Sequence, residues 1–116
     1  MSKRSINLLI EDIQEAIDKM GRYIEGMSQD SFESDEKTND AVVRNLEIIG
    51  EAANRLPKDF KDKHSEIEWD KIVGLRHRIV HEYFGVDLSL IWQILENDIP
   101  AFKYSLEKIR TPEKNE

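Results

Sequence analysis

The sequence contains no cysteine, and this absence removes whole classes of site. Without thiols there is no disulfide, no thiolate nucleophile and no zinc–thiolate centre. The chain also lacks any apolar run near the ~18 residues that a membrane-spanning helix needs. Its first four residues lead straight into an amphipathic pattern, without a separate apolar signal core. We therefore expect a soluble, intracellular protein that works in the cytoplasm and does not associate with membranes.

The chain also has fewer basic than acidic residues. Lysine and arginine number 17 against 24 acidic residues, which gives a formal net charge of −7. A nucleic-acid-binding protein usually presents a basic face, so this balance alone argues against one. Net charge does not describe a local site, however, and residues 71–81 contain three basic side chains and no acid. The acidic residues between 30 and 40 are expected to form a solvated face, or a contact for a basic partner.

The length of 116 residues indicates a single domain. Apolar residues recur at helical spacing, and no alternation typical of strands is found. The helices are expected at residues 5–27, 37–56, 69–84 and 88–109. Four amphipathic helices with short connections favour an all-α fold, an antiparallel up-and-down four-helix bundle, in which oligomerisation would help a modest core.

The connections between these helices carry their own signals. Residues 28–36 and 57–68 are polar or charged, and the second of these loops has room for a short extra helical turn. Gly85 suits the position that follows a helix C-terminus, and Asp87 suits the cap of the next helix. Pro100 should kink the last helix, because proline lacks a backbone donor and clashes with the preceding turn. The tail, 111–116, is expected to be frayed.

The segment from Arg76 to Tyr83 is the most unusual part of the chain. On a continuous helix, with about 100° per residue, Arg76 falls in the middle of the apolar face and Tyr83 lies two turns beyond it. His77 and His81 border that face, and Arg78 points to the opposite side, where it is a solvated residue or an RNA contact. A guanidinium in an apolar face must pair with an acid, with carbonyl groups or with a bound anion.

Two interpretations of the role of Arg76 follow from its position. In one, it forms a structural ion pair, with Glu47 or Glu51 as the partner. In the other, its fork of donors binds the oxygens of a phosphate group, and His81 gives or takes a proton at near-neutral pH. Together these two residue types are a minimal set for metal-free phosphodiester cleavage.

A metal site is a poorer explanation of the two histidines. His77 and His81 are four residues apart, which suits a metal, but the glutamate of the zinc-protease motif is absent between them. The adjacent Arg76 also opposes a bound cation. We expect neither a metal nor any other cofactor.

The segment resembles the signature of the HEPN superfamily, in particular its HepT-like branch. That signature consists of arginine, a polar residue, three further residues, histidine, any residue and tyrosine, here Arg76, His77, His81 and Tyr83. Asparagine or aspartate is commoner at the position of His77. The resemblance extends over nearly the whole chain, through Arg44, residues 49–52, Trp69, Ile72, Gly74, Leu75, residues 86–87 and residues 92–100.

The resemblance implies that residues 1–116 form one HEPN domain, which dimerises so that two motifs face a shared cleft. It implies a metal-independent endoribonuclease, the toxin of a toxin–antitoxin pair, with Arg76 and His81 as catalytic residues and His77 as a phosphate contact. The antitoxin of this branch is a minimal nucleotidyltransferase, which silences the toxin by placing AMP on the motif tyrosine, here Tyr83. The alternative is a non-catalytic helical subunit that binds a nucleotide or a nucleotidyltransferase, an interpretation that the acidic net charge favours.

Overall fold

The computed structural model describes residues 4–81 and 85–109, and for His81 it describes the backbone alone. In chain order the elements are α1 (Ile6–Tyr23), α2 (Gln29–Ser34), α3 (Glu36–Arg55), α4 (Lys58–Lys63), α5 (Trp69–Val73), α6 (Leu75–Ile79), β1 (Val80–His81), β2 (Gly85–Val86), α7 (Leu88–Gln93), the π-helical turn η1 (Ile94–Asp98) and α8 (Ile99–Glu107). The molecule is mostly helical, which confirms the predicted all-α class.

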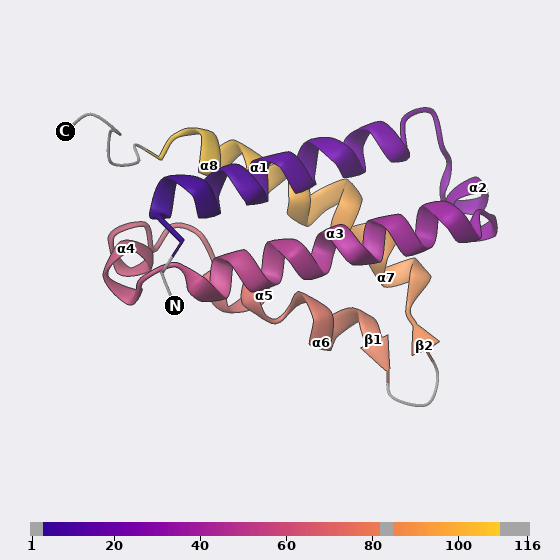
Figure 1. Ribbon diagram of the computed structural model, residues 1–116. Helices are drawn as coiled ribbons and strands as arrows, with labels where there is room; N and C mark the ends of the chain where they lie inside the picture. Colours follow the sequence, from indigo (N-terminus) through magenta and orange to yellow (C-terminus); the bar gives the residue numbers. More distant parts are fainter. Residues whose placement is uncertain (1–3, 82–84, 110–116) are drawn as a thin grey trace.

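Two long antiparallel helices, α1 and α3, form the centre of the fold and pack along each other's length (Figure 1). The short helices α5 and α6 lie against α3, and α8 returns along α1. The side chains between these layers form one core, in which Ile13, Leu46 and Ile79 have no exposed surface. None of the helices in the described residues is long and apolar enough to cross a membrane.

Capping residues set where the two long helices begin. The Ser5 hydroxyl accepts a hydrogen bond from the Leu8 amide at 3.2 Å, and the Asp35 carboxylate accepts one from the Thr38 amide at 3.1 Å. Each of these caps satisfies a backbone donor that has no partner within its helix. Helix α3 ends before Pro57, as predicted, and the amide of its buried Asn45 donates to the Ala41 carbonyl at 2.8 Å.

Both predicted loops contain short helices. The residues expected to form a linker include α2, which begins with a reciprocal cap between Ser28 and Ser31 and buries Phe32 completely. The Phe32 ring packs against Trp92, with ring centroids 5.3 Å apart. The loop after Pro57 contains α4, the short extra turn for which the sequence had left room. One apolar residue on each of these short helices, Phe32 or Phe60, holds it to the core.

The predicted third helix, 69–84, is wrong in its second half. The helix is interrupted at Gly74 and ends at Ile79, where Val80 takes an extended conformation. An antiparallel pair of short strands follows, in which Val80 pairs with Val86 and His81 with Gly85. From the sequence, Gly85 was expected just after the end of a helix. Gly85 instead lies in β2 with a φ of +75°, a conformation that glycine adopts without strain.

The last helix is distorted next to Pro100, as predicted, but by a wide turn. Residues 94–98 form a π-helical turn between α7 and α8. Proline cannot donate to the carbonyl four residues earlier, and a wider turn relieves both the missing bond and the clash of the ring. Asp87 caps α7, because its carboxylate accepts a hydrogen bond from the Leu90 amide at 3.0 Å. The side chains of Trp92 and Ile94 enter the core.

Candidate functional site

Helix α6 carries three consecutive basic residues, Arg76, His77 and Arg78, and a glycine of α3 sets how close it lies. A Cβ on Gly50 would come within 3.3 Å of the Val73 carbonyl oxygen and 3.4 Å of the Ile72 carbonyl oxygen. The backbone before α6 therefore rests directly on α3. This close approach brings the motif to the same side of the fold as the charged residues of α3.

Arg76 lies on the surface, which corrects the prediction that it faces the core. Its side chain is 67% exposed, and its Nε donates to a Glu47 carboxylate oxygen at 3.1 Å. The fully buried residues of this helix are Leu75 and Ile79, four positions apart, and they define its apolar face. One residue after Leu75, Arg76 is turned by about 100° away from that face. Of the two acids proposed from the sequence, Glu47 is the partner, whereas Glu51 pairs with Arg55.

Arg78 is the more buried arginine, contrary to the prediction that it points to solvent. Its side chain is 32% exposed, and its Nη2 lies 3.0 Å from a carboxylate oxygen of Asp98 in the π-helical turn. Its Nη1 is buried and has no hydrogen-bond partner within residues 4–81 and 85–109. This ion pair joins the motif helix to the distorted part of the last helix.

The structure describes the remaining three motif residues to different extents. His77 is exposed. The backbone of His81 belongs to β1, beside Gly85, and its side chain lies outside the described residues. Tyr83 also lies outside the described residues. Because the backbone becomes extended at Val80, the helical geometry that aligned Tyr83 with Arg76, and placed His77 and His81 on one helix face, does not apply.

Next to Arg76 the surface is hollowed into a groove of about 410 Å³ between α1, α3 and α6. Among its lining residues are Arg4, Asp12, Arg44, Glu47, Glu51, Arg55 and Arg76. On the α1 side of the groove, the hydrogen bonds that Arg4 donates to Asp12 raise the pKa of Arg4 above its ordinary value. Within the part of the chain that the structure describes, no group of three or more histidine, aspartate or glutamate residues could hold a metal ion.

Comparison with known proteins decides the family. The model of the family described as ribonuclease HepT-like matches residues 13–109, which include every motif residue from Arg76 to Tyr83. The chain belongs to the HepT-like family. The resemblance to this family that the sequence indicated is therefore confirmed.

Three relatives cover almost the whole HepT-like chain. A protein of Thermococcus cleftensis, named as a probable ribonuclease HepT, is 43% identical over 93% of this chain and 98% of its own. A Caldanaerobacter subterraneus protein named as a candidate RNase is 38% identical, over 90% of this chain and 94% of its own. A third, from Methanocaldococcus jannaschii and also named as a candidate RNase, is 37% identical, over 94% of this chain and 90% of its own. No solved structure matches this chain significantly.

Proposed function

We propose that this protein is a metal-independent endoribonuclease and the toxin of a toxin–antitoxin pair of type VII character. The observation that carries the proposal is the position of Arg76, which lies on the surface of a family-matched motif and is held by a single ion pair to Glu47. Exposed ion pairs contribute about 0–1 kcal/mol, so a phosphate group can replace Glu47 as the partner of Arg76 at little cost. The ribonuclease names of its relatives agree with such a substrate.

In the proposed reaction, the attacking group is the ribose 2′-hydroxyl of the RNA itself. The 2′-oxygen loses its proton and forms a bond to phosphorus, while the bond from phosphorus to the 5′-oxygen breaks and that oxygen gains a proton. His81 is the general acid or base for these transfers, and Arg76 neutralises the charge that builds on the phosphate oxygens. His77, exposed on the same helix, is a supporting phosphate contact. The products are a 2′,3′-cyclic phosphate and a 5′-hydroxyl.

We propose that the active form is a homodimer of four-helix-bundle subunits, in which two motifs face one cleft. The exposure of Arg76 and His77 supports this arrangement, because one copy presents them on an open surface and not inside an enclosed site. Light scattering of the purified protein is expected to give twice the mass of one chain. A mass of a single chain under the conditions of RNA cleavage would contradict the dimer.

We further propose that a minimal nucleotidyltransferase is the antitoxin and that it attaches AMP to Tyr83, in the cytoplasm where both proteins are made. An adduct only a few residues beyond Arg76 in the chain would add bulk and negative charge next to the phosphate-binding group. Mass spectrometry of the co-expressed pair should show AMP on the peptide that contains Tyr83. An unmodified peptide from a pair in which toxicity is nevertheless neutralised would exclude this mode of silencing.

A non-catalytic role is the second candidate, and the Arg76–Glu47 ion pair is the observation that favours it. In that case the protein is a helical subunit that binds a nucleotide or a nucleotidyltransferase, and Arg76 serves structure or anion binding. Growth arrest on expression distinguishes the ribonuclease from the non-catalytic subunit. The enzyme predicts arrest that is lost in the Arg76→Ala variant, whereas the partner subunit predicts no arrest with either chain.

A further inference from the structure

The groove beside Arg76 contains an unusual concentration of arginine for an acidic protein. Arg4, Arg44, Arg55 and Arg76 line it, and the acidic residues in its lining are Asp12, Glu47 and Glu51. Counted over the described residues, four positive and three negative side chains give the groove lining one net positive charge, whereas the whole chain carries −7. We call this surface the arginine groove.

Helix α3 forms one wall of the arginine groove and aligns two of its arginines. At about 100° per residue, Arg44, Glu51 and Arg55 lie within roughly 20° of one direction, so they form a row along the helix. Arg44 and Arg55 are eleven positions apart, which corresponds to about 16 Å along the axis. The groove is therefore longer than one nucleotide, and the motif arginine, Arg76, lies between its ends, because its partner Glu47 stands between Arg44 and Arg55 on α3.

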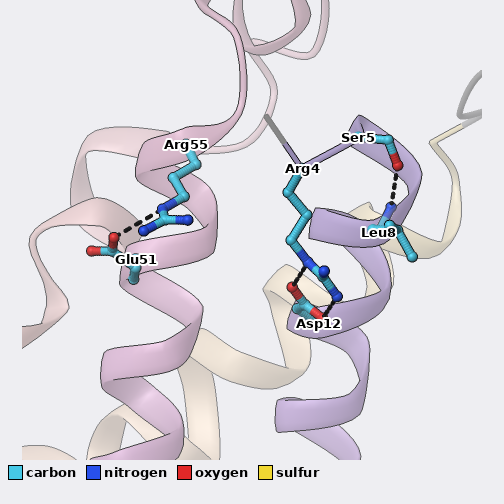
Figure 2. Close-up of polar contacts among 6 residues, drawn as sticks. All are labelled: Arg4, Ser5, Leu8, Asp12, Glu51 and Arg55. Atoms are coloured by element: carbon cyan, nitrogen blue, oxygen red, sulfur yellow. Dashed lines mark hydrogen bonds and ion pairs between the residues drawn. The ribbon is translucent and has the colours of Figure 1, made fainter. Parts of the chain in front are cut away.

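Three of the four arginines are held in place by carboxylates. Figure 2 shows two of these pairs, Arg4 with Asp12 on the α1 side of the groove and Arg55 with Glu51 on α3. The distances from arginine Nε to carboxylate oxygen are 2.6 Å and 3.0 Å. All of these side chains are at least 32% exposed, so the pairs are of the weak kind that an incoming phosphate can replace.

Arg44 differs from the other three. It is exposed, and within residues 4–81 and 85–109 no hydrogen bond or ion pair occupies its guanidinium. It is the source of the net positive charge of the arginine groove. A guanidinium of this kind offers two parallel donors to the oxygens of a phosphate group.

Two of the three apolar residues that line the arginine groove are buried. Leu9 and Ala52 are 2% and 5% exposed, Ile48 is partly buried, and the polar groups that the groove presents are guanidinium and carboxylate. Among the described residues that line the groove none is aromatic, so these walls offer bases no ring on which to stack. A polyanionic backbone fits these walls better than an apolar helix or a base-reading partner does.

We propose that the arginine groove binds the RNA backbone next to the cleavage site, with Arg44 and Arg55 contacting phosphates that flank the one held by Arg76. This inference rests on the proposed ribonuclease activity. The contacts position the strand without reading its sequence, because only phosphates are bound. The carboxylates keep the arginines oriented in the free protein, and they lower the affinity for RNA by their charge.

The test compares steady-state cleavage of two substrates, a dinucleotide with one phosphodiester and a longer single-stranded oligoribonucleotide. For the longer substrate, Arg44→Ala is expected to raise KM by about tenfold with kcat unchanged, and Arg44→Lys to recover part of the loss. For the dinucleotide, whose single phosphate is held by Arg76 and which has no flanking phosphate for Arg44, both parameters should stay at the wild-type values. Glu51→Gln removes a negative charge and should lower KM for the longer substrate.

Arg22→Ala is the matched control, because it removes an exposed arginine from the opposite end of α1. Binding of the longer RNA at several salt concentrations supplies a second readout. Arg44→Ala should make the slope of log Kd against log salt shallower by about 0.7, the value for one phosphate contact on a single strand, and Arg22→Ala should leave it unchanged.

The outcomes separate this inference from the proposed activity. If the wild-type protein cleaves neither substrate, the proposed function fails and this inference falls with it. If the wild-type cleaves both but Arg44→Ala and Arg22→Ala give equal KM values for the longer RNA, the groove proposal alone is overturned. A loss of the dimer in Arg44→Ala, measured by light scattering, would overturn it too, because the groove would then belong to a contact between copies.

Discussion

The ion pair between Arg78 and Asp98 should stabilise the fold more than a typical surface pair does, because it is half-buried. The two side chains are 32% and 37% exposed, with 3.0 Å between nitrogen and oxygen. The pair joins α6, which carries the motif, to the π-helical turn before Pro100. We expect Asp98→Asn to lower the free energy of unfolding by about 1–2 kcal/mol, since it leaves the partly buried guanidinium without its charged acceptor.

The magnitude that isolates the pair is the coupling energy of a double-mutant cycle. For Arg78→Gln, Asp98→Asn and the double variant, we expect a coupling of about 1 kcal/mol, at the upper end of the range for exposed pairs. The chain supplies a matched control in Arg55 and Glu51, which lie at the same 3.0 Å but are 61% and 63% exposed. That pair, four residues apart on one helix, should give about 0.3–0.5 kcal/mol.

Urea unfolding followed by circular dichroism measures both cycles. The dependence of the unfolding free energy on urea concentration should be the same for all variants, so that their unfolding free energies can be compared directly. The expected difference between the two coupling energies comes from the different burial of the two pairs. Equal coupling energies for the two pairs would show that the position of Asp98 in the π-helical turn adds nothing to the anchoring of the motif helix.

Three further predictions concern glycines and are measured by the same unfolding experiment. Gly50→Val should destabilise the protein by about 1–3 kcal/mol, since its side chain would meet the Val73 and Ile72 carbonyl oxygens, and a wild-type stability would show that α5 does not rest on α3 so closely. Gly21→Ala, in an open part of α1, should instead stabilise it by about 0.5–1 kcal/mol, so a loss would contradict the space assigned there. Gly85→Ala should cost about 1 kcal/mol because the φ of Gly85 is +75°, and an unchanged midpoint would count against that backbone conformation.

Local patterns predicted the long elements of this fold well. The stripes of α1 and α3 gave these helices to within a few residues, because the spacing of apolar residues directly reflects the face that packs on the core. Asp87 was correctly predicted as a cap. Pro100 was correctly predicted to distort the last helix, because its missing donor acts at the position where it stands.

The third helix was predicted poorly because its shape depends on contacts between distant segments. The break at Gly74 accompanies the approach of α5 to Gly50, and the hairpin after Ile79 is held by bonds between strands and by the Asp87 amide, which donates to the Ile79 carbonyl at 2.8 Å. Neither contact appears in a helical wheel. The helical wheel therefore predicted the wrong environment for two arginines. It placed Arg76 on the buried face and Arg78 on the exposed face, whereas Arg76 is the more exposed of the two.

The family resemblance was not affected by that error, because it rests on the order and spacing of residue types and not on the backbone between them. The family match includes Arg76, His77, His81 and Tyr83 whether the segment is a helix or a hairpin. The ion pair with Glu47 was one of the alternatives that the sequence offered, and it is confirmed. What sequence reasoning missed was Arg44 as part of a groove, because its neighbours there come from α1 and α6.

The central claim is that Arg76 and His81 cleave RNA without a metal. The most direct measurement is the identity of the cut ends formed by the purified protein in excess chelator. We predict 2′,3′-cyclic phosphate and 5′-hydroxyl ends for the wild-type chain, and no cut ends for folded Arg76→Ala and His81→Ala variants. Cleavage by the His81→Ala variant at the wild-type rate, or 3′-hydroxyl ends in place of cyclic phosphates, would contradict the account.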